Sequence, residues 1–348
     1  MTTKLQIITP DDWHLHLRDG PVMAAVLPQT SFWCNRAIVM PNLVPPVVTG
    51  ADAAAYRNRI TEVLDARANF MPLMTLYLTE QTDTDDLTAA VKSGIATAVK
   101  LYPAGATTNS ASGVKDINKV MPVLEVLAEA GAPLLVHGEV TDPDIDIFDR
   151  EAVFIERVLA PLHQRLPQLK IVFEHITTRQ AVEFVAAAND QIAATVTPHH
   201  LIINRNAYLA GGIKPHYYCL PVAKREIHRL ALLDAVLSET GKFFLGTDSA
   251  PHLDTAKLQP CGCAGIFNAP NAVACLAQLF DNAGRIELLE GFTSIYGPQF
   301  YGLDVNSDRL TLVKHDSPQP LPQPIQTDEG PITVFDPQMD VFWSVETA

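Results

Sequence analysis

Short apolar runs alternate along this chain with longer stretches in which apolar residues recur every three or four positions. Short apolar runs are typical of strands buried in a parallel sheet, and a period of about 3.6 residues is typical of amphipathic helices. The pattern predicts strands at 13–19, 36–43, 69–79, 95–102, 133–139, 170–175, 192–197 and 242–248. It predicts helices at 21–31, 51–67, 84–93, 117–130, 150–166, 178–188, 223–240 and 271–282.

Eight strands alternating with helices favour an α/β fold of the (β/α)8 type, a TIM barrel. The alternative is an open, doubly wound sheet, but no Gly-x-Gly-x-x-Gly follows the first strand, so its dinucleotide-binding form has no support. The segments 309–314 and 332–335 are β-like and are joined by a Pro-rich run. We expect one barrel domain over 1–348, with a β-containing C-terminal extension from about residue 305.

The amino-acid composition limits the kinds of partner that the protein can bind. The 348 residues carry 25 basic and 39 acidic side chains, a net charge of −14, which disfavours binding to nucleic acid or anionic membranes. No uncharged apolar run approaches the roughly 18 residues of a membrane span, and no signal peptide is apparent. The five cysteines are an odd number and predict free thiols in a cytoplasmic protein. Cys261 and Cys263 are interpreted as loop residues with an ordinary thiol role.

The first predicted strand carries unusual chemistry. Residues two apart in a strand point to the same face. His14, His16 and Arg18 would therefore share one face, and the three apolar residues from Trp13 to Leu17 the other. Imidazole is the commonest metal ligand among side chains, so the histidine pair is a candidate metal site.

Four further polar residues lie near the carboxyl ends of apolar strands, where barrel enzymes place their active sites. They are Lys100, His137, His175 and Asp248. Taken singly, a strand histidine is more often a core residue, a strand-end lysine usually reaches for water, and an aspartate often sits in a turn. Together with the histidine pair they can hold one catalytic zinc with ligands to spare, which favours a second metal. A lysine fits beside two cations if its neutral amine has added carbon dioxide to form a carbamate.

These residues resemble the metal centre of the amidohydrolase superfamily, and more closely that of dihydroorotases of the short bacterial and fungal type. The matching motifs are 12–20, 40–43, 99–105, 136–139, 174–177, 197–201 and 246–252. The resemblance runs in order from residue 12 to about 300. Because the His-x-His motif lies so near the start, we expect no N-terminal strands of the flanking β-sandwich found in hydantoinase-like relatives.

The resemblance implies reversible interconversion of N-carbamoyl-L-aspartate and L-dihydroorotate, in pyrimidine biosynthesis. It implies two Zn2+ per subunit, bridged by hydroxide and by carboxylated Lys100 (N6-carboxylysine). Asp248 would act as the catalytic base and acid. One zinc would be held by His14, His16, Lys100 and Asp248, and the other by Lys100, His137 and His175.

The resemblance also assigns substrate contacts and a closing lid. The substrate residues are His16, Arg18, Asn42, His137, Leu220, His252 and Ala264, and the lid residues are Thr107 and Thr108. The plainer alternatives are that Arg18 pairs with Asp19 or Asp12, that Asn42 is a turn residue, and that the loop 103–113 is merely flexible. A homodimer is implied as well.

His199 and His200 are adjacent and would point in opposite directions as strand residues, so they are interpreted as structural or supporting residues. Two other functions remain open at this point. A hydantoinase or dihydropyrimidinase would share the fold, but its substrates usually lack the carboxylate that Arg18 would bind. A non-catalytic scaffold relative would typically have lost metal ligands, whereas all six candidates are present here.

Overall fold

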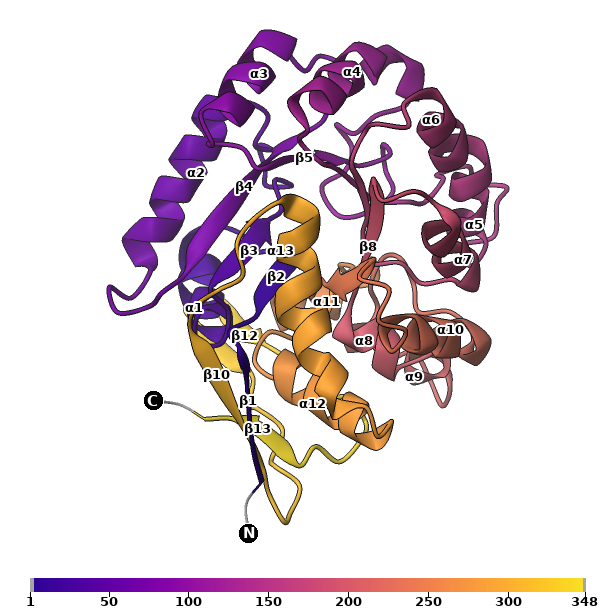
Figure 1. Cartoon of the computed structure of the whole chain (residues 1–348). Helices are drawn as coiled ribbons and strands as arrows, with labels where there is room; N and C mark the ends of the chain where they lie inside the picture. Colours follow the sequence, from indigo (N-terminus) through magenta and orange to yellow (C-terminus); the bar gives the residue numbers. More distant parts are fainter. Residues whose placement is uncertain (1–2, 347–348) are drawn as a thin grey trace.

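Eight parallel strands form a barrel at the centre of the molecule, and helices surround it (Figure 1). The computed structural model describes residues 3–346. The barrel strands follow chain order: β2 (Asp11–Leu15), β3 (Arg36–Val39), β4 (Met71–Tyr77), β5 (Ala98–Leu101), β6 (Leu134–Val136), β7 (Ile171–Phe173), β8 (Ile192–Val196) and β9 (Phe243–Leu245). The eight predicted strands and the barrel are thus confirmed, although the observed strands are shorter.

Helices connect successive barrel strands, as the periodicity predicts. The longer ones are α1 (Gly20–Ser31), α2 (Gly50–Val63), α3 (Thr84–Lys92), α4 (Met121–Ala130), α7 (Arg179–Ala187), α10 (Glu226–Val236) and α12 (Ala272–Asn282). A continuous helical segment joins α5 (Arg150–Phe154), the π-helix η2 (Ile155–Leu159) and α6 (Ala160–Arg165). Shorter elements are α8 (Pro198–Ile202), α9 (Asn206–Leu209), α11 (Asp254–Lys257), α13 (Tyr296–Tyr301), the 3-10 turns η1 (Ile117–Val120), η3 (Pro215–Tyr217) and η4 (Ile286–Leu288), and the π-helix η5 (Gly291–Ile295).

Local capping sets several helix ends. The Thr178 hydroxyl accepts a hydrogen bond from Ala181 N and begins α7, as expected for an N-cap threonine. Asp83 caps α3 in the same way. Gly131 ends α4 with a φ of 67°, a left-handed conformation that glycine adopts without strain. The predicted helix 223–240 is wrong at both ends, because only Glu226–Val236 is helical.

The barrel closes between its first and last strands. Asp248 N donates to His14 O at 2.9 Å, and His16 N donates to Ser249 O at 3.1 Å. The buried Asp12 carboxylate accepts from both the backbone N and the hydroxyl of Thr247, and from His14 N. These bonds join the carboxyl ends of β2 and β9. The polar residues at the ends of these two strands therefore meet where the barrel closes.

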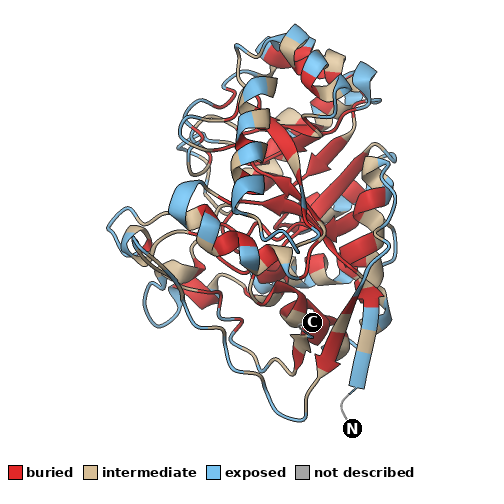
Figure 2. Ribbon diagram, turned by 90° about the vertical axis from the view of Figure 1, so that its left-hand side faces the viewer, coloured by how far each residue is buried: buried red, intermediate tan, exposed pale blue. Residues whose placement is uncertain are grey.

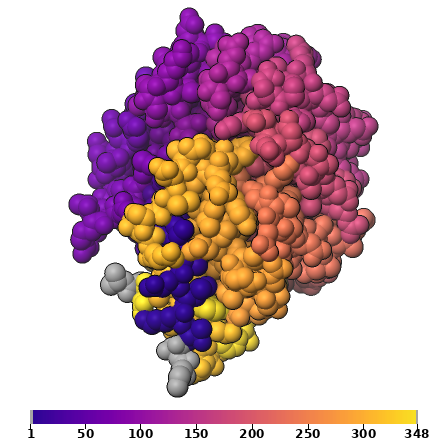
Figure 3. All heavy atoms as spheres, viewed as in Figure 1, coloured from indigo at the N-terminus to yellow at the C-terminus, as the bar shows by residue number. Residues whose placement is uncertain are grey.

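The barrel strands consist mostly of buried residues, which Figure 2 colours red, and further buried residues lie on the helices around them. The barrel interior holds a cluster of Trp13, Ile38, Met40, Ala98, Leu135, Val172, Ala193 and Phe244. Helix α13 packs against this cluster at the amino-terminal end of the strands, with Tyr301 stacked on Trp13 at 4.2 Å between ring centroids. Gly297 is required there, because a Cβ would lie 1.9 Å from Trp13 Nε1. The atoms of α13 cover the centre of this face (Figure 3), so the barrel is open only at the carboxyl end.

The predicted geometry of the first strand is partly wrong. β2 ends at Leu15, and its pairing with β3 shifts register between Asp12 and Leu15. Trp13 therefore joins the barrel interior, whereas Leu15 packs in the outer layer between strands and helices. Arg18 lies beyond the strand and has a φ of 61°. Its approach to the site comes from a left-handed turn and not from strand alternation.

The expectation of no N-terminal strand in a flanking sheet is also wrong. β1 (Thr3–Ile8) pairs antiparallel with β10 (Arg309–Lys314), which also pairs with β13 (Trp343–Val345). The strand at 309–314 is confirmed. The segment 332–335 is mostly not a strand, because β12 (Gly330–Ile332) ends at Ile332 after its hairpin with β11 (Ile325–Thr327). The C-terminal segment and the chain's start thus form one small sheet beside the barrel (Figure 1).

Candidate metal centre and substrate pocket

The six predicted ligand residues lie at the carboxyl ends of the barrel strands. His14 is in β2 and His16 follows it, Lys100 is in β5, and the other three come just after β6, β7 and β9. All six are buried. His175 and Asp248 have φ values of 42° and 43°, which non-glycine residues seldom adopt. Backbone strain of this kind is concentrated at functional sites, because the surrounding structure has to maintain it.

The ligand atoms converge. His14 Nε2 and His16 Nε2 are 3.2 Å apart, and Asp248 Oδ1 lies 3.3 Å from the first and 3.1 Å from the second. The His175 ring centroid is 4.9 Å from those of both His14 and His137. Four imidazoles and a carboxylate therefore surround one small volume.

Three of the imidazoles have an oxygen of a neighbouring side chain close to one ring nitrogen. The pairs are His14 Nδ1 with Glu174 Oε1 at 2.9 Å, His16 Nδ1 with Asn42 Oδ1 at 2.9 Å, and His137 Nε2 with Glu139 Oε2 at 3.0 Å. A carboxylate or amide oxygen favours a proton on the nitrogen it faces, which leaves the other ring nitrogen as a lone-pair donor. His175 Nδ1 is buried without a hydrogen-bond partner among the described residues, and the contact of His14 Nδ1 with Glu174 Oε1 is close but does not have hydrogen-bond geometry.

Burial decides the protonation of these groups. It lowers the pKa of His16 to about 3 and holds that of His175 well below its ordinary value. Burial alone would favour the neutral form of Asp248, but the adjacent His14 and His16 hold the pKa of Asp248 well below its usual range. Neutral imidazoles beside an ionised carboxylate are the states in which these groups bind a metal ion.

Lys100 lies beneath the pocket and is fully buried. Its Nζ contacts Glu174 Oε2 and lies 4.8 Å from the centre of the Tyr102 ring. Burial disfavours the ammonium and lowers the pKa of Lys100 well below its ordinary value, although the negative charge of Asp248 opposes this shift. A neutral amine is the form that can add carbon dioxide.

The donor set fits a divalent metal centre. Zinc is coordinated by neutral imidazole nitrogens and carboxylate oxygens. The cluster offers converging imidazole nitrogens, a carboxylate oxygen close to them and an unpartnered ring nitrogen on His175. Two overlapping groups have ligand geometry: His14, His16 and Asp248, and His14, Glu174 and His175. The second includes Glu174, which the sequence did not single out as a ligand.

The predicted substrate residues border the same pocket. Its lining includes His14, His16, Arg18, Asn42, Tyr102, Thr107, Thr108, His137, His175, Leu220, Asp248 and Ala264. His252 is not in the lining and lies behind Arg18, with its Nε2 3.0 Å from both Arg18 Nη2 and Ala264 O. The structure thus brings all the predicted site residues into one region, with Lys100 and His252 set behind its surface.

Arg18 does not form either of the plainer ion pairs considered from the sequence. Asp19 pairs with Arg59, and Asp12 binds Thr247. Within residues 3–346, no carboxylate lies within salt-bridge distance of Arg18, whose bonds go to Pro251 O and to His252. The guanidinium is therefore free to receive an anionic ligand.

The loop 103–113 folds over the pocket. Thr108 Oγ1 donates to Ala264 O at 3.3 Å, and Asn42 Nδ2 donates to Thr108 O at 3.1 Å. Asn109 Nδ2 in turn donates to Asn42 O. Asn42 thus joins the loop to His16, which gives it a role beyond that of a turn residue.

Comparison with known proteins identifies the family of this chain. A family model described as the amidohydrolase family matches residues 7–312. Proteins named dihydroorotase from Ruegeria sp. and Chelativorans sp. are 61% and 60% identical over 345 and 342 residues, covering 99% and 98% of this chain and 100% and 99% of theirs. This chain belongs to the amidohydrolase family, among the dihydroorotases.

Solved dihydroorotase structures agree with this assignment. The enzyme from Saccharomyces cerevisiae, in complex with 5-fluoroorotic acid, has a TM-score of 0.90 at 31% identity, with 99% of this chain and 98% of that chain covered. The enzyme from Campylobacter jejuni has a TM-score of 0.90 at 33% identity over the same shares of the two chains. The L-hydantoinase of Arthrobacter aurescens, at 15% identity, a TM-score of 0.81, and 98% and 83% coverage, shares the fold.

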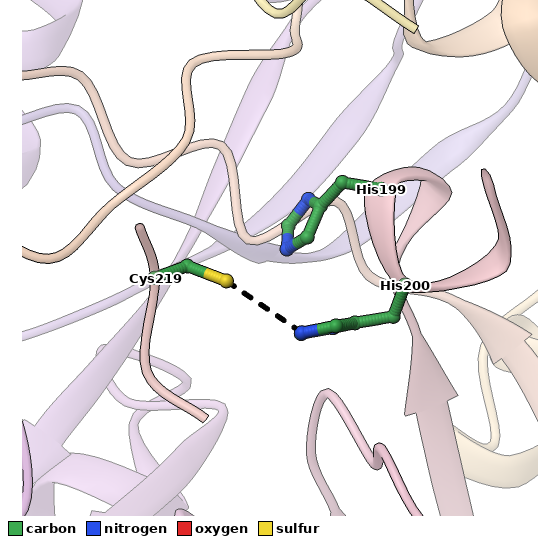
Figure 4. Close-up of side chains that lie close together, drawn as sticks. All are labelled: His199, His200 and Cys219. Atoms are coloured by element: carbon green, nitrogen blue, oxygen red, sulfur yellow. Dashed lines mark hydrogen bonds between the residues drawn. The ribbon is translucent and has the colours of Figure 1, made fainter. Parts of the chain in front are cut away.

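A second buried cluster contains His199, His200 and Cys219 (Figure 4). The expectation that the two histidines point in opposite directions is wrong, because they lie on α8 with ring centroids 4.4 Å apart. His200 Nδ1 faces the Thr197 hydroxyl at 2.9 Å, and His200 Nε2 faces Pro221 O at 3.0 Å. A nitrogen that faces a carbonyl must carry the proton, so His200 has no lone pair to offer. Burial raises the pKa of the Cys219 thiol to about 12.

Several residues near the centre were not assigned a role from the sequence. Glu139 and Glu174 orient imidazoles, and Asp12 joins the two strands that carry ligands. Tyr102 lines the pocket with a buried hydroxyl that has no partner among the described residues. A signal was available for the two glutamates, because a carboxylate inside an apolar strand and next to a histidine needs a buried partner.

Proposed function

We propose that the protein is a zinc-dependent dihydroorotase that interconverts N-carbamoyl-L-aspartate and L-dihydroorotate. The observation that carries the proposal is a guanidinium free of carboxylates beside a cluster of converging metal ligands. The first feature suits an anionic substrate, and the second suits hydrolysis of an unactivated amide. High identity over the full length to proteins named dihydroorotase supports the same reaction.

Two zinc ions would be held by the cluster. His14, His16 and Asp248 would hold one, His137 and His175 the other, and a carboxylated Lys100 would reach both. Bound zinc supplies a hydroxide nucleophile at neutral pH, by lowering the pKa of water to about 7, and polarises the amide carbonyl. A carbamate, as an anion, would also offset the repulsion between two cations.

Asp248 would move the proton. Its carboxylate lies within 3.3 Å of two imidazoles and borders the pocket. In ring opening it would take the proton of the attacking water and deliver it to the leaving ring nitrogen. Ring closure would run the same transfers in reverse.

Arg18 would bind the substrate carboxylate, with Asn42 and His252 beside it. We expect Arg18→Ala to raise the KM for dihydroorotate about 100-fold, because removing one partner of a buried charge pair leaves the other unpaired. The effect on kcat should be smaller, since the base and the metal ligands remain. Steady-state kinetics with dihydroorotate measure both constants, and an unchanged KM would refute this role.

An ultraviolet assay of dihydroorotate hydrolysis, with and without a chelator, tests the proposed function. We expect activity in the metal-loaded protein, loss of nearly all of it after chelation, and recovery on adding zinc. Dihydrouracil, which has the ring but no carboxylate, is the matched substrate. Comparable turnover of both substrates would favour a dihydropyrimidinase, and folded protein purified without chelator that contains no metal would favour a scaffold role.

The same proposal includes a homodimer. Sedimentation at several protein concentrations measures the molecular mass in solution.

The residues described contain no helix long and apolar enough to cross a membrane.

A further inference from the structure

Lys257 is a buried lysine at the end of α11, and three backbone carbonyls surround its amine. Nζ donates to Tyr218 O at 2.8 Å, to Cys263 O at 2.9 Å and to Gly265 O at 2.7 Å. An ammonium has three donors, so all of them are used. The side chain is 3% exposed. Burial lowers the pKa of Lys257 to about 8, while three carbonyl acceptors stabilise the charged form, so the ammonium persists at neutral pH.

These carbonyls belong to the two segments that border the substrate pocket at Leu220, Ala264 and Gly265. Tyr218 lies two residues before Leu220, and Cys263 and Gly265 flank Ala264 on both sides. Gly265 N also donates to Tyr218 O at 3.0 Å, which ties the segments together. Gly265 has a φ of 153°, and a Cβ there would lie 2.6 Å from Ala250 O, so the backbone itself packs against the site. Lys257 therefore binds the backbone of both segments at once.

The charge of this lysine has no local counterion. Within residues 3–346, no carboxylate lies within salt-bridge distance of Lys257, and its three partners are neutral. Its positive charge acts on His252, whose pKa burial, Arg18 and Lys257 together hold at about 2. Arg18 and Lys257 are thus two cations near one pocket, neither of them in a salt bridge within residues 3–346, in a protein with a net charge of −14. Such a pair is costly in the free protein and is offset when an anion binds.

We propose that Lys257 is a positioning residue for carboxylate-bearing substrates: it fixes the backbone at Leu220 and Ala264 and adds a second positive charge to the pocket. This inference rests on the proposed function. Lys257 touches neither the metal ligands nor the reacting atoms, so its effect should fall on substrate affinity and not on the chemical step.

Three substitutions separate the two contributions. Lys257→Met removes donors and charge, Lys257→Gln removes the charge and keeps two donors, and Lys257→Arg keeps the charge. We expect Lys257→Met to raise the KM for dihydroorotate and the Kd for orotate about tenfold or more, a loss in the range of hydrogen bonds to a charged group. We expect kcat to change less than about threefold, Lys257→Gln to show an intermediate affinity and Lys257→Arg to restore most of it. Kinetics and calorimetric titration of orotate measure these quantities.

Thr333→Val is the matched control, because it loosens α11 from its other side. Thr333 N and Oγ1 donate to the two carboxylate oxygens of Asp254 at 3.0 and 2.9 Å, away from the pocket. We expect this variant to melt at a lower temperature with an unchanged KM. An equal KM increase in Thr333→Val and Lys257→Met would show that general loosening explains the effect and would overturn the inference.

Metal content and wild-type activity distinguish the two proposals. If the wild-type protein hydrolyses dihydroorotate but all three Lys257 variants keep its KM and its Kd for orotate, the inference fails and the proposed function stands. If the metal-loaded wild-type protein neither hydrolyses dihydroorotate nor binds orotate, the proposed function fails and this inference fails with it. Should Lys257→Met not fold, Lys257→Gln compared with Lys257→Arg decides the question of charge.

Discussion

Asp248→Asn should lower kcat for dihydroorotate hydrolysis about 1000-fold, in the range that general acid–base groups contribute. The amide keeps the size of the side chain and one oxygen near His14 and His16, but it cannot accept the proton of the attacking water. The protein should still fold and retain much of its metal, because the other five candidate ligands are unchanged. Steady-state kinetics and metal analysis of the same preparation measure both outcomes.

Asn268→Ser is a useful comparison for this variant. Asn268 Nδ2 donates to Thr247 O, next to Asp248, and to His199 Nδ1, and it does not line the pocket. We expect a modest loss of stability and far less loss of kcat than in Asp248→Asn. Near-normal turnover by the Asp248→Asn protein would remove this carboxylate as the base.

Lys100→Met should abolish most of the activity, again by about 1000-fold or more. Methionine fills much of the same buried volume but cannot form a carbamate, so two metal ions would lose their shared anionic ligand. If the wild-type protein holds two zinc ions as proposed, we expect at most one per chain in this variant. Metal analysis after dialysis counts the ions, and activity is measured on the same sample.

Lys224→Met is the matched substitution of another buried lysine. Lys224 is 4% exposed, and its Nζ donates to Val222 O at 2.9 Å. We expect this variant to lose stability while it keeps the metal content of the wild-type protein. A density map or intact mass of active, metal-loaded enzyme with an unmodified Lys100 would dispose of the carbamate.

The barrel could be predicted because each of its strands can be recognised from a short stretch of sequence. Each buried strand is a short apolar run, and each predicted ligand interrupts such a run near its carboxyl end. The rule that barrel sites lie at this end then gathers residues from distant strands, such as His14, His137 and Asp248, without any knowledge of their contacts. The comparisons confirm the family that these motifs indicated.

Features that depend on distant pairing or unusual backbone could not be predicted. β1 is a strand because β10, about 300 residues away in sequence, pairs with it. The register shift in β2 and the positive φ of Arg18 have no counterpart in the pattern of apolar residues. The position of Lys257 is of the same kind, because its three carbonyl partners come from two separate segments.

The wrong prediction that the His199 and His200 side chains point in opposite directions could have been avoided from the sequence. Thr197 followed by Pro198 is a common helix start, with a threonine N-cap and proline at the first helical position. The structure begins α8 there, with the Thr197 hydroxyl accepting from His200 N at 3.0 Å. Treating residues 199 and 200 as strand residues, beyond the predicted strand 192–197, placed the two rings on opposite sides.

The closure between β2 and β9 affects how the protein is made. A chain emerging from the ribosome presents His14 and His16 early, but Asp248 follows only after more than 230 further residues. Until then, Asp12 cannot bind Thr247, so the barrel is not closed, and the nascent chain has only part of the candidate ligand cluster. An ion that binds the complete cluster stabilises only the finished barrel, by mass action. Zinc supply during synthesis should therefore influence the yield of folded protein as well as its activity.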